Sequence, residues 1–195
     1  MYFFVLFFSI FAIIVFNLIF NFTWQTLLNL LISFAIVLLP SLICAVLIRF
    51  LPKSWLDNEH KIFKVSKKER NFYDKINIKK WKDKIPEFGQ TVGFKKNKIE
   101  NPNDPVYLKK FIQETVYGEI LHFFCILTAL LSLFFVPKHL LLCMALPIAI
   151  VYVCYNIPSL IIQRYNRPRL EVIYARSLRN AQQETMSIEL ESINY

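Results

Sequence analysis

The first 48 residues decide the fold, and they read MYFFVLFFSIFAIIVFNLIFNFTWQTLLNLLISFAIVLLPSLICAVLI. This stretch contains no Asp, Glu, Lys, Arg or His, and the first charged residue is Arg49. A single helix of that length would measure roughly 72 Å, whereas the hydrocarbon core of a bilayer is ~30 Å thick. The stretch therefore predicts two membrane-spanning helices, at about 2–20 and 25–50, separated by the polar break from Asn21 to Gln25.

A cleaved signal peptide followed by one span is the alternative interpretation of these residues. Such a peptide has a basic N-terminal region and small residues at its cleavage site. The sequence shows neither feature. We therefore favour two spans.

Two more apolar stretches lie towards the other end of the chain. Residues 120–136 read ILHFFCILTALLSLFFV, and residues 140–162 form a second run after a short connection. Each is close to the ~20 residues that a transmembrane helix needs. A membrane β-barrel would show alternating apolar and polar residues instead. The sequence thus predicts a second helical hairpin and an all-α integral membrane protein of about four transmembrane helices.

The basic residues predict the orientation of these helices. Between Pro52 and Gly118 there are 16 Lys and Arg against 9 Asp and Glu, and five arginines follow Ile162. The short loops expected on the other side carry only Lys138. Because Lys and Arg are enriched in cytoplasmic loops, we expect a multi-pass cell-membrane protein with both termini and the long loop in the cytoplasm. Such charge suits anionic lipid headgroups or an anionic substrate, and we expect no nucleic acid as a partner.

Four segments follow from this pattern. They are an N-terminal transmembrane hairpin (1–51), a basic cytoplasmic or interfacial loop (52–118), a C-terminal transmembrane hairpin (119–163), and a basic interfacial helix with a tail (164–195). Beyond Pro168, apolar residues recur at helical spacing beside arginines. We expect this segment to be an amphipathic helix that lies on the cytoplasmic leaflet.

A first polar cluster occurs where the third span begins. Thr115, Glu119 and His122 fall within about 60° of one another on a helix, and Glu114 lies nearby. Glu119 is three residues before His122, so its carboxylate could hold the imidazole and make it a general base for a hydroxyl or thiol. A Glu–His pair that serves packing alone is the other interpretation.

A second cluster ends the fourth span. Asn156, Ile157 and Pro158 place a polar side chain and a helix breaker near the membrane, and residues 163–169 read QRYNRPR. The three arginines offer planar donor groups suited to phosphate or carboxylate, although anchoring at the cytoplasmic side would also explain some of them. Both clusters should meet at the cytoplasmic face, where the third span enters and the fourth exits. A zinc site is poorly supplied, because only one histidine is near, and we expect neither metal nor cofactor.

Three motifs resemble a known family. They are KKWKDKIPEFG (79–89), FIQETVYGEILHF (111–123) and NIPSLIIQRYNRPRL (156–170), and they resemble the glycosyl-4,4'-diaponeurosporenoate acyltransferases. These membrane enzymes esterify a sugar hydroxyl with a fatty acyl chain in a carotenoid pathway. Tyr117 and Phe123 stand where the family pattern has an arginine and a tryptophan. The resemblance implies O-acyl transfer to a glycosylated lipid at the cytoplasmic face.

The resemblance also implies roles for individual residues. His122 would be the general base, Glu119 would orient it, and Glu114 is the weaker candidate for that role. The arginines would hold phosphates of the donor or, with Asn166, polarise the developing oxyanion. The expected substrate-binding residues are Trp81, Thr115, Gln163, Arg164, Tyr165, Asn166, Arg167 and Arg169.

The expected partners are a lipid acceptor, membrane lipids, and an acyl donor such as acyl-CoA or acyl carrier protein. A non-catalytic lipid-binding or assembly subunit of a membrane enzyme complex is the alternative function. Such a subunit would use the same arginines for headgroups and the Glu–His pair for helix packing.

Overall fold

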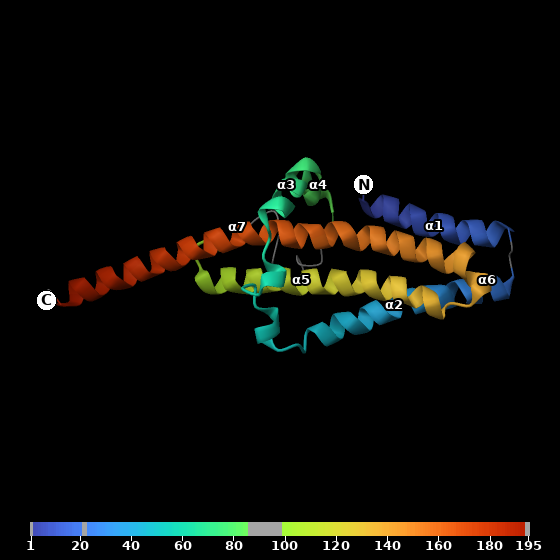
Figure 1. The fold of residues 1–195 in the computed structure, drawn as a ribbon, viewed down its shortest axis with the longest axis horizontal. Helices are drawn as coiled ribbons and strands as arrows, with labels where there is room; N and C mark the ends of the chain where they lie inside the picture. Colours follow the sequence, from blue (N-terminus) through green and yellow to red (C-terminus); the bar gives the residue numbers. More distant parts are fainter. Residues whose placement is uncertain (1, 21–22, 86–98, 194–195) are drawn as a thin grey trace.

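A computed structural model describes residues 2–20, 23–85 and 99–193, and within these ranges the chain contains helices and no strand. In Figure 1 the long helices run side by side, and the short helices α3 and α4 lie to one side of them. The long helices are α1 (Tyr2–Phe20), α2 (Trp24–Ile48), α5 (Pro105–Ser132) and α7 (Leu146–Ile193). The shorter elements are η1 (Lys53–Leu56), η2 (Lys61–Phe63), α3 (Lys67–Lys75), α4 (Ile78–Trp81), η3 (Lys82–Lys84), η5 (Leu133–Phe135), α6 (Lys138–Leu140) and the π-helical turn η6 (Leu141–Ala145).

Polar side chains fix where the helices begin. The Thr23 hydroxyl accepts a hydrogen bond from the Thr26 amide at 3.0 Å at the start of α2. At the start of α5, the Asp104 carboxylate accepts from the amides of Val106 and Tyr107 at 2.8 and 3.1 Å. Each cap satisfies amides that lack a partner within the helix. The start of α2 at Trp24 is close to the expected start of the second helix, and residues 21–22 of the expected break lie outside the described ranges.

Among the described residues, three helical segments are long and apolar enough to cross a membrane, where the sequence predicts four. They are Trp24–Ile48, Pro105–Phe135 and Lys138–Leu190. The helix α1 has 19 residues, and the apolar stretch identified in it is Phe8–Asn17. The side chains of residues 2–7, 18 and 20 lie outside the described part of the chain.

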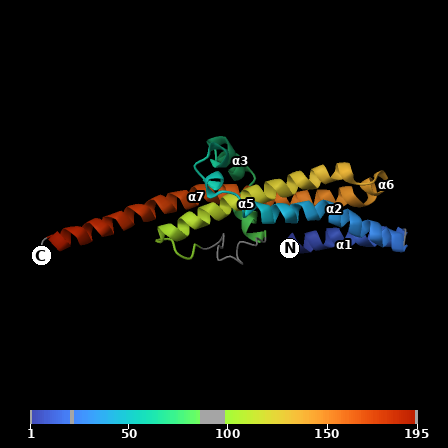
Figure 2. The same cartoon turned by 90° about the horizontal axis from the view of Figure 1, so that it is seen from below.

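The helices pack through small and polar side chains. Ala129 of α5 and Ala149 of α7 are at most 1% exposed and meet Val37 of α2 in one buried cluster. The hydroxyls of Ser41 and Thr128 lie 2.9 Å apart between α2 and α5. Such contacts are typical of membrane bundles, because small residues let helices approach closely where lipid removes the usual hydrophobic drive. Figure 2 shows the same arrangement from below.

One continuous helix contains both the fourth predicted span and the segment beyond Pro168. The helix α7 passes through both Pro158 and Pro168 and reaches Ile193. Leu170, just after the second proline, is 3% exposed and packs in one cluster with Phe111 of α5. The segment after Pro168 is thus a continuation of α7 and not a separate helix, and its location on the cytoplasmic leaflet stays a prediction. Its first turns are held against α5, and Figure 1 shows the remainder extending past the end of that helix.

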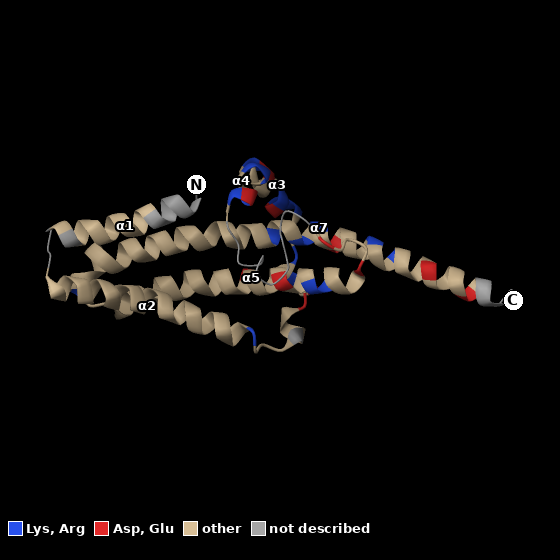
Figure 3. Cartoon of the chain, turned by 180° about the vertical axis from the view of Figure 1, so that it is seen from behind, with Lys and Arg blue, Asp and Glu red and all other residues tan. Residues whose placement is uncertain are grey.

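The charged residues gather at one half of the molecule. Figure 3 shows Lys, Arg, Asp and Glu on α3, α4 and the neighbouring parts of α5 and α7, whereas α1 and most of α2 are without charge. The end of α1 and the start of α2 lie at the opposite end, together with α6 (Figure 1). The long apolar half and the short charged half match the polarity of a bilayer and its surface.

Candidate functional site

An ion network joins α5 to α7. The Glu119 carboxylate of α5 lies between two arginines of α7, and its Oε2 accepts from Arg167 Nη2 at 2.5 Å. Its Oε1 accepts from Arg164 Nη1. Arg164 and Arg167 are three residues apart, which places both on one face of α7. The sequence therefore brings two guanidinium groups to one carboxylate.

Arg167 is enclosed by protein, and its side chain is 1% exposed. Its Nε donates to the Thr115 hydroxyl at 3.0 Å, and its Nη2 also donates to the Thr115 carbonyl at 3.1 Å. Its Nη1 donates to the carbonyl of Phe63 at 2.8 Å, and the Phe63 ring lies 5.6 Å from the guanidinium carbon. A buried charge is tolerated when it is paired and its donors are bonded, and Arg167 meets both conditions.

Arg164 ties the long loop to the helices. Its Nε and Nη2 donate to the two oxygens of Glu69 on α3, at 2.5 and 3.0 Å. Its Nη1 also donates to the carbonyl of Ile62 at 3.0 Å. Tyr73 donates to Glu69 from the next turn of α3. Two arginines and two carboxylates thus balance, and they join α3, α5 and α7.

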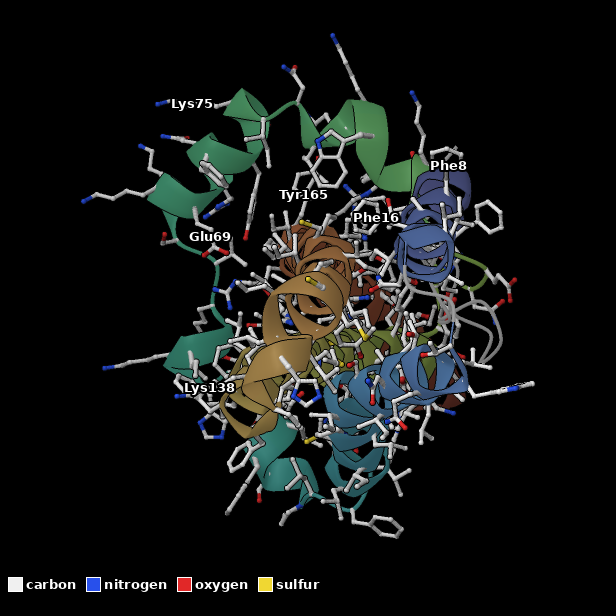
Figure 4. The ribbon with its side chains drawn as sticks, turned by 90° about the vertical axis from the view of Figure 1, so that its right-hand side faces the viewer. Phe8, Phe16, Glu69, Lys75, Lys138 and Tyr165 are labelled. Carbon is white, nitrogen blue, oxygen red and sulfur yellow. The ribbon has the colours of Figure 1, made fainter. Side chains whose placement is uncertain are left out.

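The pKa values of Glu69 and Tyr73 in the long loop are shifted by this pairing. Burial raises the pKa of the Glu69 carboxyl, but hydrogen bonds from Arg164 and Tyr73 together with the Arg164 charge outweigh it, and the net pKa is below its usual value. Burial and the bond to Glu69 raise the pKa of the Tyr73 hydroxyl. Figure 4 shows Glu69 and Tyr165 on the facing sides of their helices, and the rings of Tyr73 and Tyr165 meet edge to face with centroids 6.0 Å apart.

His122 is held by Asn156 and not by Glu119. Its Nδ1 lies 2.8 Å from Asn156 Oδ1, and Asn156 Nδ2 donates to the Tyr152 carbonyl at 2.8 Å. The amide oxygen therefore faces the ring, so a neutral His122 carries its proton on Nδ1 and has its lone pair on Nε2. The expected contact between Glu119 and His122 is wrong, because charged donors on α7 occupy both oxygens of Glu119.

Glu114 lies apart from this pair. Its two carboxylate oxygens accept from Arg49, at the end of α2, at 3.0 and 3.2 Å. The guanidinium carbon of Arg49 lies 4.6 Å from the centre of the Tyr117 ring. The pair connects α2 to α5 on a partly exposed surface.

The other predicted residues occupy separate places. Gln163 lies against Gly118, where an added Cβ would come within 2.9 Å of Gln163 Cδ. The indole N–H of Trp81 donates to the carbonyl of Ile76 at 3.0 Å. Asn166 and Arg169 line a cavity of about 300 Å³ between α5 and α7. The remaining walls of this cavity are apolar and consist of Ile99, Pro102, Phe111, Leu170 and Ile173.

Sequence reasoning missed Glu69 and the partnership of Asn156 with His122. The only local signal for Glu69 is the spacing Ser66–Glu69, in which the Ser66 hydroxyl accepts from the Glu69 amide at 3.2 Å and begins α3. That pattern marks a helix start and says nothing of a distant arginine. Across the described part of the chain, no group of three or more His, Cys, Asp or Glu is placed to hold a metal ion.

Comparison with known proteins gives one match. The family model described as glycosyl-4,4'-diaponeurosporenoate acyltransferase matches residues 52–176, which is more than half of the chain. The matched interval contains the ion network, the His122–Asn156 pair and the cavity. No curated protein and no solved structure matches the chain.

Proposed function

Because the chain belongs to the glycosyl-4,4'-diaponeurosporenoate acyltransferase family, we propose that it transfers a fatty acyl chain to a hydroxyl of a glycosylated lipid. The acceptor is a carotenoid glycoside or another glycolipid, and the reaction takes place at the cytoplasmic face of the cell membrane. The charge distribution supports this face, because the charged half of the molecule carries the candidate site (Figure 3).

Both termini belong on the cytoplasmic side in this proposal. The end of α1 and the start of α2 lie near α6, away from α3 and α4 (Figure 1). Residues near that end include Lys138, the only basic residue expected there. The positive-inside rule then assigns the end with the long loop to the cytoplasm.

The hydrogen bond between His122 and Asn156 carries the mechanistic part of the proposal. With its proton on Nδ1, His122 presents the lone pair of Nε2 to the acceptor hydroxyl. The base takes the hydroxyl proton while the oxygen attacks the acyl carbonyl of the donor. The tetrahedral intermediate then collapses, the C–O ester bond remains, and the leaving group departs with the proton from the imidazolium. Asn156 is the positioning residue, in place of the expected Glu119.

The ion network has a supporting role in this mechanism. Glu119, Arg164 and Arg167 satisfy one another and hold the loop carbonyls of Ile62 and Phe63 beside α7. In the proposal, the loop held against α7 in this way keeps water from the acyl donor and fixes the acceptor. Thr115, Gln163 and Tyr165 line the same region in the proposal, and Trp81 and Glu114 lie on its periphery.

Lipid mass spectrometry on cells that express matched amounts of each variant tests the function. Cells supplied with glycolipid acceptors should accumulate an acylated product with the wild type and with His139→Ala, a matched histidine change on α6. His122→Ala should reduce the product by about 10²- to 10⁴-fold, the usual effect of a general base.

His122→Gln separates catalysis from packing. Glutamine can bond to Asn156 but cannot take a proton, so the product should still be lost while the protein accumulates normally. Wild-type product levels from this variant would contradict a general base. Identical lipid profiles with and without the wild-type chain would instead support the lipid-binding or assembly subunit.

A further inference from the structure

The cavity between α5 and α7 has two polar residues on an otherwise apolar wall. Asn166 and Arg169 lie three residues apart on α7. They line a cavity of about 300 Å³ together with Phe111 of α5. We propose that this cavity binds the phosphoryl group of an anionic amphiphile. The phosphate accepts hydrogen bonds from Arg169 and Asn166, and the apolar wall contacts the first carbons beyond it.

Arg169 differs from the other arginines of its helix segment. Arg164 and Arg167 are neutralised by Glu119 and Glu69 and are largely enclosed. Arg169 is exposed and makes no ion pair or hydrogen bond with any residue in the described ranges. Of these three guanidinium groups, that of Arg169 is therefore the one whose charge no carboxylate in the described ranges balances, and its donors remain available for a ligand.

The volume of the cavity limits which part of a ligand it can hold. Ligand pockets usually measure about 300–1,000 Å³, so this one lies at the lower limit. It holds a phosphorylated headgroup and not a whole acyl chain or a glycosylated lipid. The acyl chain of the amphiphile lies outside it, where the apolar surfaces of the helices continue.

The position of the cavity indicates how its ligand is connected to the chemistry. Phe111 precedes His122 by 11 residues on α5, which corresponds to about 16 Å along the helix. A donor with a long arm between its phosphates and its thioester, as in an acyl-CoA, spans that distance. A phospholipid carries its esters close to its phosphate and does not. Naming the ligand as the acyl donor rests on the proposed transferase function, whereas the phosphoryl site itself does not.

Binding measurements on the purified full-length chain in detergent test the site. The probes are a non-hydrolysable thioether analogue of acyl-CoA and a short-chain phosphatidylglycerol, each titrated against the wild type, Arg169→Gln and Arg176→Gln. Arg176 is exposed on the same helix and provides the matched control. Arg169→Gln should weaken binding about tenfold, the effect of one charge-assisted hydrogen bond at a partly solvated site, and Arg176→Gln should leave it within twofold.

The two probes distinguish the sources of the phosphate. An Arg169-dependent affinity for the CoA analogue supports the donor, and one for phosphatidylglycerol alone supports a lipid headgroup at the same site. Equal affinities of Arg169→Gln and Arg176→Gln for both probes would overturn the proposal, even with acyl transfer in cells intact. Arg169-dependent binding by a chain that yields no acylated lipid in cells would keep the site and remove the transferase function.

Discussion

Replacing Arg167 with methionine tests whether the buried ion network holds the helices and the loop together. The substitution keeps an apolar side chain of similar length but removes the ion pair with Glu119 and the donors to Thr115 and Phe63. Removing one member of a buried pair, including the carbonyls that it leaves without a donor, costs about 3–5 kcal/mol. Because Arg164 still neutralises Glu119, we expect the lower part of this range, a loss of about 3–4 kcal/mol in the free energy of unfolding.

Guanidinium unfolding in detergent, followed by tryptophan fluorescence, measures that loss. Arg176→Met, on an exposed part of α7, is the control and should stay within about 0.5 kcal/mol of the wild type. Protease should also cut the loop around Phe63 faster in Arg167→Met, because the bond that holds its carbonyl is gone. Equal stability and equal cleavage of the two variants would show that the network contributes nothing to holding the loop.

Three further changes test other parts of the structure. Since the folded pKa of Glu69 is lowered, its pairing with Arg164 stabilises fully above the unfolded value of about 4.3 and is lost as pH falls through the folded value. Thermal unfolding from pH 7 to 3 should show the gap between the wild type and Glu69→Gln closing at low pH, and a constant gap would contradict the pairing. Gly118→Ala displaces the movable Gln163 side chain, while the gain in helix propensity of about 1 kcal/mol keeps stability near that of the wild type. Acyl transfer at the wild-type rate would then remove Gln163 from substrate contact. Ala129→Leu overfills the buried junction of α2, α5 and α7, and chemical unfolding should show a loss of about 1–3 kcal/mol in the free energy of unfolding. An unchanged free energy would show that α5 does not pack tightly at this position.

The helix boundaries could be read from local chemistry. The uncharged stretch and its polar break predict helices at about 2–20 and 25–50, and the structure has Tyr2–Phe20 and Trp24–Ile48. A helix boundary depends on the residues within one turn of the helix end, so it can be predicted from the local sequence. Three of the four predicted spans are identified among the described residues; in α1, which is 19 residues long, the apolar stretch identified is Phe8–Asn17.

The partners of the polar residues could not be read in the same way. Spacing along α5 correctly groups Glu119 and His122, but each bonds to α7 instead of to the other. The choice depends on which face of α7 meets α5, and helix spacing alone does not determine that. Pro168 likewise looks like a helix end in isolation. The helix continues past it with Arg167 and Leu170 both buried on either side of it.

The unbroken helix α7 also limits how the chain can change in length. It carries Asn156, Arg164 and Arg169 on a single frame, and each residue inserted into a helix turns everything beyond it by 100°. One residue added between Asn156 and Arg164 would leave His122 paired but rotate both the ion network and the cavity wall away from α5. Four added residues would bring the wall back to within about 40° but move it about 6 Å along the axis. A substitution in α7 therefore affects one contact at a time, whereas insertions and deletions are tolerated only beyond the last contact with α5.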